Sequence, residues 1–301
     1  MRRGLIFAAA LLSLPARSLA DPASDARFDS IVQPYAQNGR FSGAVLVVRD
    51  GTVLFDRAYG MADAQAGIPN RPSTSFHVGT LSMQYTAVAI EFLAESHKLS
   101  LDNTADQFVP GAPLMTIRDL LAVAPDDPKV AADYELLARV AAAAMGKSFA
   151  DVEDAGAFGT VWMNGTGIDD GTLLPQTRMA KGYVVDTGMP KLVTADWARL
   201  AGSASAFTTT KDELYWLDRF FGDGLVSHED RLAMTAGSAG YGWFRGRPLD
   251  NDAYWMSGKA PGFASYVLRE RDLTVIVLAN VADAPAMMIG NGLAAQARGG
   301  K

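Results

Sequence analysis

The segment VGTLSMQYTAVAI, residues 78–90, has the pattern of a helix that carries a hydroxyl nucleophile on its first turn. Thr80 supplies the hydroxyl, and Met83 follows three residues later, which is nearly one helical turn further along the chain. A serine or threonine becomes a nucleophile only when a neighbouring group takes its proton, and a thioether accepts no proton near neutral pH. The sequence therefore predicts a hydroxyl at position 80 that lacks a partner base.

Thr80 also has a purely structural interpretation. A threonine that opens a helix accepts a hydrogen bond from a free backbone N–H group and so stabilises the start of the helix. Because no base accompanies the hydroxyl, we favour this capping role over nucleophilic attack. Ser82 offers no replacement, since it points about 200° around the helix from Thr80 and is followed three residues later by Tyr85.

Strands are predicted near both ends of the chain, and helices are predicted between them. Residues 42–60 contain two strand-like runs around Asp50-Gly51, which is a strong hairpin signal. We expect an α/β (α+β) fold in which N- and C-terminal strands pair in one antiparallel sheet and residues 80–220, roughly, form an inserted helical lobe. Further strands are expected at 241–246, 264–271 and 273–280 with a tight turn at Arg271-Asp272, and helices at 25–38, 80–98, 116–124, 134–152 with a stop at Gly146, 210–221 with Thr210 as its N-cap, and 284–297.

The first twenty residues have the pattern of a secretory signal peptide. Arg2 and Arg3 precede an apolar run over residues 5–14, and a small-x-small cleavage site ends at Ala20. We therefore expect cleavage near Ala20 and a periplasmic or secreted protein. Residues 21–301 are then expected to form a single domain, because no low-complexity linker divides them.

Composition excludes several classes of function. The chain has 27 Lys and Arg against 33 Asp and Glu, a net charge of −6, and the predicted cleavage removes three of the arginines. Such an acidic protein is not expected to bind nucleic acid or an anionic membrane surface. Without cysteine it has neither disulfides nor thiolate metal sites. The three histidines, His77, His97 and His228, have no second ligand at metal spacing, and no run after residue 20 is long enough to span a membrane.

The order of several short segments resembles that of the β-lactamase-related serine hydrolases, the group of class C β-lactamases, D-alanyl-D-alanine peptidases and related esterases. The resemblance covers roughly residues 28–283. It implies an antiparallel sheet flanked by helices, a helical subdomain, a site in the cleft between them, and no metal or organic cofactor. The segments are FSGAVLVVRDGTVLFDRAYGMADAQAGIPNRPSTSFHVGT, QYTAVAIEFLAESHKLSLD, MTIRDLL, YELLARVAAAAMGKSFAD, GSASAFTTTKDELYW, GYGWF and APGFASYVLRERDLTVIVLAN.

The resemblance also implies where a catalytic serine and lysine would stand. The family carries an S-x-x-K motif at the start of its long helix, where the serine attacks a carbonyl and the lysine helps to remove its proton. The matching tetrapeptide here is Thr-Leu-Ser-Met, residues 80–83. Threonine has a hydroxyl crowded by its methyl group, and Met83 removes the base.

Two further family motifs are degenerate in this chain. The Y-x-N motif aligns with residues 129–131, so Lys129 and Ala131 stand in place of its tyrosine and asparagine, in a loop shorter than the family's. The K-T-G or H-x-G triplet aligns with residues 256–258, where Met256 replaces the cation or imidazole and Gly258 is retained for substrate approach. Lys259 lies one residue beyond the triplet.

These absences predict an exported pseudo-hydrolase that keeps the fold to bind a ligand or a partner. The ligand expected is a cell-wall peptide or a small acyl compound; a protein partner is not identified. The alternative is a weak acyl hydrolase of the esterase, β-lactamase or D-Ala peptidase type, which uses Thr80 with a base recruited from Lys129, Lys259 or His77. Met83 and Met256 are expected to fill the cleft or to line an apolar pocket, with filling slightly favoured.

Overall fold

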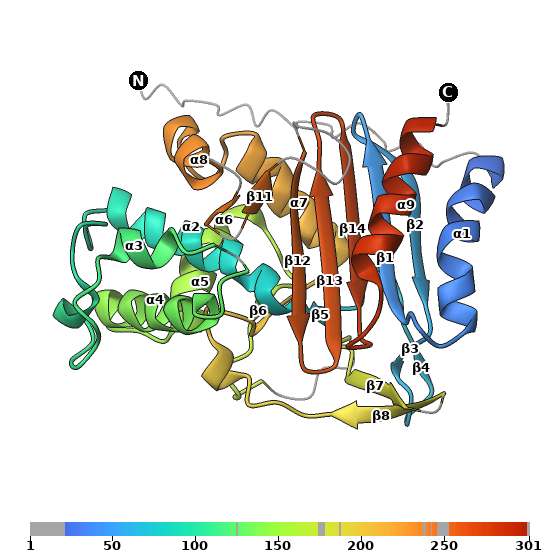
Figure 1. The fold of residues 1–301 in the computed structure, drawn as a ribbon, viewed down its shortest axis with the longest axis horizontal. Helices are drawn as coiled ribbons and strands as arrows, with labels where there is room; N and C mark the ends of the chain where they lie inside the picture. Colours follow the sequence, from blue (N-terminus) through green and yellow to red (C-terminus); the bar gives the residue numbers. More distant parts are fainter. Residues whose placement is uncertain are drawn as a thin grey trace, which may run out of the picture.

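The computed structural model describes residues 22–124, 126–173, 178–186, 188–236, 239–241, 243–245 and 253–299. Its main feature is a seven-stranded sheet with helices on its faces and a largely helical region beside one edge (Figure 1). The predicted signal peptide and its cleavage site lie outside the described residues. Among the described helices, none is long and apolar enough to cross a membrane.

The seven strands are antiparallel and follow the order β10-β11-β12-β13-β14-β1-β2. Strand β1 pairs with β14 from Gly43 opposite Ala279 to Arg49 opposite Leu273, which confirms the predicted pairing of N- and C-terminal strands. The strands are β1 (Gly43–Arg49), β2 (Thr52–Tyr59), β10 (Ala239–Gly240), β11 (Trp243–Arg245), β12 (Tyr254–Ala260), β13 (Phe263–Arg269) and β14 (Leu273–Ala279).

The predicted hairpin forms between β1 and β2. Asp50 and Gly51 have φ angles of 49° and 72°, the left-handed pair that a two-residue turn with the twist of a sheet requires. The expected tight turn at Arg271-Asp272 also lies between two paired strands, since β13 ends at Arg269 and β14 begins at Leu273. Both turns follow from local sequence alone.

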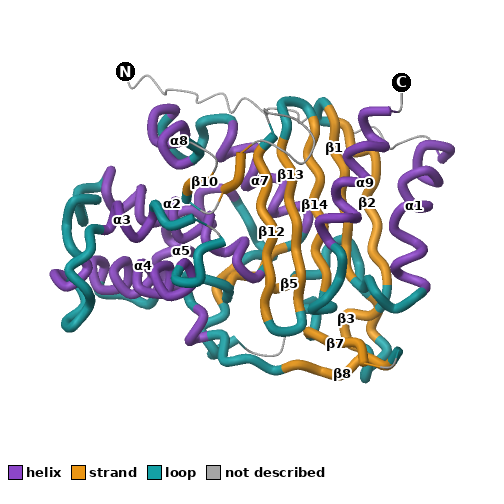
Figure 2. The backbone as a smooth tube through the Cα atoms, viewed as in Figure 1, coloured by secondary structure: helices purple, strands orange, loops and turns teal. Residues whose placement is uncertain are grey.

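Helices lie against both faces of the sheet (Figure 2), and each face has its own apolar core. On one face, α1 (Pro22–Gln37) and α9 (Ala286–Gly299) bury Phe28 and Leu293 together with strand residues such as Tyr266. On the other face, α7 (Thr210–Phe221) buries Trp216, and the core continues into the helical region. Because side chains alternate between the two faces along each strand, the strands contribute residues to both cores.

The helical region differs from the sequence prediction in its boundaries. The expected helix at 80–98 is a 3-10 turn, η1 (Gly79–Ser82), followed by α2 (Met83–Glu95). The expected helix at 134–152 begins one turn earlier, as α4 (Val130–Met145), and stops at Gly146 as predicted, where the backbone is left-handed. Its last part is a separate helix, α5 (Phe149–Glu153), capped by Ser148. The remaining elements here are η2 (Ala105–Gln107), α3 (Ile117–Leu121), η3 (Asp154–Phe158), α6 (Gly159–Val161), η4 (Ala198–Leu200) and α8 (His228–Met234).

Three small sheets attach to this frame. The first contains β5, from which the chain enters η1, and the other two are ribbons at one end of the molecule (Figure 1). The small sheets comprise β5 (Phe76–His77), β9 (Ala206–Thr208) and β6 (Gly167–Ile168); β3 (Met61–Asp63) and β4 (Ile68–Pro69); and β7 (Gly182–Asp186) and β8 (Met189–Val193).

The cap of α7 is Thr209, whose side chain accepts a hydrogen bond from the backbone N–H of Asp212, so the predicted cap at Thr210 is wrong by one residue.

Candidate active site

Two glycines bring strand β12 against the turn that carries Thr80. Gly79 opens η1 with a φ of +60°, and a Cβ atom there would lie 2.4 Å from the carbonyl carbon of Lys259. A Cβ atom on Gly258 would lie 2.0 Å from the carbonyl oxygen of Val78. Because neither position has room for a side chain, both need glycine. The space beside Gly258 is thus taken by the backbone of the chain itself, and this contact fixes Thr80 beside β12.

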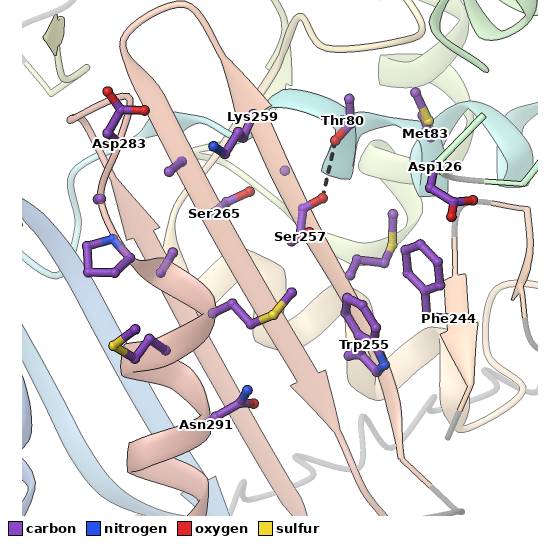
Figure 3. Close-up of a pocket in the computed structure, with 18 residues that line it drawn as sticks. Thr80, Met83, Asp126, Phe244, Trp255, Ser257, Lys259, Ser265, Asp283 and Asn291 are labelled. Carbon is purple, nitrogen blue, oxygen red and sulfur yellow. Dashed lines mark hydrogen bonds between the residues drawn. The ribbon is translucent and has the colours of Figure 1, made fainter. Parts of the chain in front are cut away.

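The Thr80 hydroxyl is committed to a backbone carbonyl. Its Oγ1 donates a hydrogen bond to the carbonyl oxygen of Ser257 on β12 at 3.2 Å (Figure 3). Neither η1 nor α2 has a side-chain cap, so the predicted capping role of Thr80 is wrong. A carbonyl oxygen orients the hydroxyl but does not remove its proton, so this contact does not activate a nucleophile.

Ser82, the other hydroxyl of this turn, is buried and structural. Its Oγ donates to the carbonyl oxygen of Gly79 at 2.7 Å and accepts from the backbone N–H of Ala206 at 3.0 Å. The first bond lies within η1, and the second ties η1 to strand β9. Ser82 therefore holds the turn together, and it lies outside the described lining of the cavity around Thr80.

The two methionines at the degenerate motif positions lie together at the site. Met83 is 1% exposed and Met256 is 2% exposed. Both line a single cavity of about 810 Å³ together with Thr80 and Gly258 (Figure 3). The cleft is therefore open, although both thioethers pack against the core.

The rest of the cavity wall comes from three other parts of the chain. Phe244 and Trp255 stack with ring centroids 4.4 Å apart on β11 and β12. The start of α9 contributes Met287 and Met288, and the short loop before α4 contributes Asp126. The wall is mostly apolar, a composition typical of pockets that bind small molecules. Its complete described lining is Thr80, Met83, Asp126, Phe244, Trp255, Met256, Ser257, Gly258, Lys259, Ala264, Ser265, Asp283, Ala284, Pro285, Ala286, Met287, Met288 and Asn291.

Of the lysines that the sequence offers as recruited bases, one lines the cavity. Lys259 lies on β12 with an exposed side chain, on the wall that also holds Thr80. Lys129 is exposed at the N-terminus of α4 and is not part of the described lining, and Ala131 is likewise outside it. The structure thus brings together the first and third motif positions but not the second.

His77 is not placed to act as a base on Thr80. Its ring is 4% exposed and its Nε2 lies 3.0 Å from Oδ2 of Asp169. The ring stacks on Trp197 with centroids 3.6 Å apart, and burial lowers the pKa of the imidazole below its ordinary value against the opposing effect of Asp169. His77 lines a different cavity from Thr80, so its side chain serves the packing behind the turn.

Sequence reasoning missed most of the cavity wall. Asp126 lies in a shortened loop without a recognisable register, and Asp283 and Met287 lie some two hundred residues after Thr80. No local pattern connects these residues. Trp255 and Ser257 alternate with Met256 and Gly258 along β12, so their side chains lie on the opposite face of that strand.

Chemically, the cavity can bind a compound with an apolar body and offer it one cation and two carboxylates. Among the described lining residues the basic group is Lys259, and the acidic groups are Asp126 and Asp283. Met83, three residues after Thr80, occupies the position at which the resemblance implies a catalytic base, and it lines the cavity with Thr80. The cavity thus has the groups to bind a ligand, but the position one turn after Thr80 has no group that can remove the proton of its hydroxyl.

Comparison with known proteins agrees with this geometry. The sequence model of the β-lactamase family matches residues 28–124. Esterase EstB from Burkholderia gladioli is 34% identical over 119 residues, which are 36% of this chain and 29% of the esterase. Teichoic acid D-alanine hydrolase from Staphylococcus aureus (strain MRSA252) is 30% identical over 79 residues, which are 26% of this chain and 20% of the hydrolase. The match therefore spans less than a third of the length of these curated relatives.

The similarity of fold extends over nearly the whole chain. A class C β-lactamase from Rhodobacter sphaeroides superposes with a TM-score of 0.72 at 21% identity, covering 92% of this chain and all of the other. The fold is thus the mixed fold that the sequence predicts, with an antiparallel sheet and flanking helices. The family match is thus confined to residues 28–124, and the fold of nearly the whole chain is similar to that of class C β-lactamases.

Proposed function

We propose that this protein is an exported, catalytically impaired member of the β-lactamase-related serine hydrolase family, and that it binds a small acyl compound or a cell-wall peptide in the cavity around Thr80. One observation carries the proposal. The Thr80 hydroxyl donates to a backbone carbonyl, and the residue one turn later, where the family has its lysine, is a buried methionine. Loss of a general base costs about 10²–10⁴ in rate, and damage to a nucleophile–base unit costs as much as about 10⁶.

The cavity supports binding as the retained role. A cleft that had lost all use could close as side chains repacked, yet this one keeps about 810 Å³, within the range of about 300–1,000 Å³ typical of ligand sites. Methionines supply four of its lining side chains, and their flexible thioethers adapt to apolar ligands of varied shape. Export of the protein rests on the predicted signal peptide.

Ligand binding is tested with N-phenyl-1-naphthylamine, an apolar dye that fluoresces on leaving water. Met288 lines the cavity from the first turn of α9 and is 60% exposed, so Met288→Glu should fold and should weaken dye binding by placing a charge at the cavity wall. Met189 on β8 is 69% exposed and outside the cavity, which makes Met189→Glu a matched control. Equal affinity of the two variants would argue against binding in this cavity.

Catalytic impairment is tested by turnover. Wild-type protein and Thr80→Ala are compared on a p-nitrophenyl ester and on a chromogenic β-lactam. We expect both proteins to hydrolyse these compounds no faster than buffer, because Thr80 has no base. Hydrolysis by the wild type that disappears in Thr80→Ala would overturn the proposal.

A weak acyl hydrolase is the second candidate, and Lys259 favours it. This lysine lies on the same cavity wall as Thr80, and a neutral amine there could take the hydroxyl proton. The two relatives reported above are a hydrolase and an esterase by name. This candidate predicts slow hydrolysis by the wild type that either Lys259→Met or Thr80→Ala abolishes. The preferred proposal predicts no hydrolysis by the wild type.

A further inference from the structure

A second cavity, separate from the one around Thr80, lies where α7 begins beside β2. Its volume is about 450 Å³, and it shares no lining residue with the first cavity. Polar and charged side chains make up most of its described wall. Because the first cavity is mostly apolar, the two are suited to different ligands.

An exposed tryptophan forms the rim of this second cavity. Trp162 is 81% exposed, although tryptophan is among the residues most buried on average. Its neighbours Val161 and Met163 are buried, at 7% and 4%, so they anchor the chain while the indole points outward. Trp162 also has a left-handed backbone with φ of 59°, a conformation that is costly for a bulky residue. The turn therefore presents an indole face to solvent at some energetic cost.

The turn that carries Trp162 is held rigidly against α7. The carboxylate of Asp212 accepts from the backbone N–H of Gly165 at 2.6 Å and from the hydroxyl of Thr166 at 3.1 Å. The hydroxyl of Ser75 donates to the carbonyl oxygen of Gly165 at 2.8 Å. These bonds hold the backbone of the turn that carries Trp162 against α7, which lowers the entropy cost of ordering this turn when a ligand binds.

Several polar groups that face this cavity have no partner within the described chain. The indole N–H of Trp162, the side-chain amide of Asn164 and the guanidinium of Arg178 make no hydrogen bond or ion pair with any other described group. Lys211 lies over the ring of Tyr215 with its ammonium 5.5 Å from the ring centroid. Donors and acceptors without partners, gathered around one cavity, are what a polyhydroxylated ligand needs.

We infer that this cavity binds a neutral saccharide, whose ring stacks on the Trp162 indole while its hydroxyl groups bond to Asn164, Arg178 and Lys211. The C–H bonds on one face of a sugar carry partial positive charge and pack against the negative face of an indole. The positive side chains Arg178 and Lys211 are accompanied in the wall by the carboxylates of Asp56 and Asp212. This balance of charge disfavours a phosphorylated ligand such as a nucleotide, which would also stack on an indole.

The test uses the tryptophan indoles as reporters, because the chain has five tryptophans and so gives five indole N–H signals in an ¹⁵N-labelled sample. The signal of Trp162 is identified as the one that is absent from the spectrum of the Trp162→Asn variant. Asparagine suits the left-handed backbone at this position. Cellotetraose, tetra-N-acetylchitotetraose and maltotetraose are titrated in turn, with AMP as the phosphorylated comparison. At least one sugar should shift the Trp162 signal saturably, and AMP should not.

Two variants and a matched control complete the test. By isothermal titration calorimetry with the sugar that shifts the signal, Trp162→Asn should weaken binding tenfold or more and Arg178→Ala about threefold or more. Leu114 is also 81% exposed and lies outside this cavity, so Leu114→Ala should bind as the wild type does. The inference is overturned if no sugar shifts the signal, if AMP alone shifts it, or if Trp162→Asn binds sugar as tightly as the Leu114→Ala control.

Discussion

A methyl group added at Gly258 should strongly destabilise the protein, because it would fall on the contact that positions Thr80. The new carbon would lie 2.0 Å from the carbonyl oxygen of Val78, 2.4 Å from Oγ of Ser265 and 2.9 Å from the backbone nitrogen of Leu81. Non-bonded heavy atoms are attracted at separations of about 3.5 Å, so β12 and η1 would have to separate by more than about 1 Å.

The expected loss can be estimated from these contacts. Overpacking a well-packed interior costs about 1–3 kcal/mol, and the upper end applies here because two of the three obstructing atoms belong to the backbone. The hydroxyl of Ser265 also donates to the carbonyl oxygen of Val78 at 2.7 Å, and losing that bond adds about 1 kcal/mol. We therefore expect Gly258→Ala to lower the free energy of unfolding by about 3–4 kcal/mol.

Urea unfolding followed by tryptophan fluorescence measures this loss. Gly299→Ala is the matched control, since a Cβ atom at Gly299 meets no atom within 4 Å and its backbone is helical. Its free energy of unfolding should stay within about 0.5 kcal/mol of the wild type. If Gly258→Ala and Gly299→Ala unfold at the same urea concentration, the close contact between β12 and η1 is not present in solution.

Other predictions concern buried and capping groups away from the cavity. Burial raises the pKa of Glu153 to about 8 from its ordinary value of 4.5. Between these two pH values the folded protein holds a proton that the unfolded chain has lost, so the free energy of unfolding should fall as pH rises from about 4.5 to about 8. Glu213, whose pKa is raised to about 7, lowers stability in the same way up to about that pH. The effect of Glu153 on the free energy of unfolding is therefore measured between about pH 7 and 8. Glu153→Gln should flatten the dependence of the unfolding free energy on pH there, and an unchanged slope in urea titrations would contradict the assignment. Thr209→Ala should cost about 1 kcal/mol by removing the cap of α7, whereas Thr209→Ser should keep it. Equal urea midpoints for these two variants would show that the cap has no effect.

The central sheet could be predicted from the sequence because its turns have local sequence signals and its strands have regular apolar patterns. The Asp50-Gly51 turn fixes the β1–β2 hairpin, and the apolar runs at both ends of the chain predict strands that pair. The helix at the C-terminus was harder, because its glycines lower helix propensity. The structure explains one of them: a Cβ atom at Gly290 would lie 2.3 Å from the ring of Tyr266, so glycine lets α9 approach the sheet.

The start of the candidate site could be located in the sequence, but its side-chain interactions could not. The resemblance aligns residues 80–83 with the family's S-x-x-K motif, yet the Thr80 hydroxyl bonds to Ser257, 177 residues away, rather than capping its own helix. Propensity favours capping for a threonine at this place, and tertiary contact decides otherwise. The burial of His77 against Trp197 likewise depends on a segment that is remote in sequence.

The alternatives for the two methionines were also settled only by tertiary structure. Met83 and Met256 are buried as filling side chains would be, and they nevertheless border an open cavity. The cavity wall combines residues of β12, the start of α9 and the loop before α4, which are remote in sequence and share no motif. Lys129 could not be placed from sequence because its short loop has no fixed register, and it lies outside the described lining.

The most direct test of the proposed loss of catalysis is covalent labelling of Thr80, followed by intact-mass spectrometry. Wild-type protein, Thr80→Ala and the double variant Thr80→Ser with Met83→Lys are incubated at length with a fluorophosphonate probe and with a β-lactam. We predict no mass increase for the wild type, because its hydroxyl has no base, and labelling of the double variant, whose first turn regains a serine and a lysine. A wild-type adduct that disappears in Thr80→Ala would contradict the account.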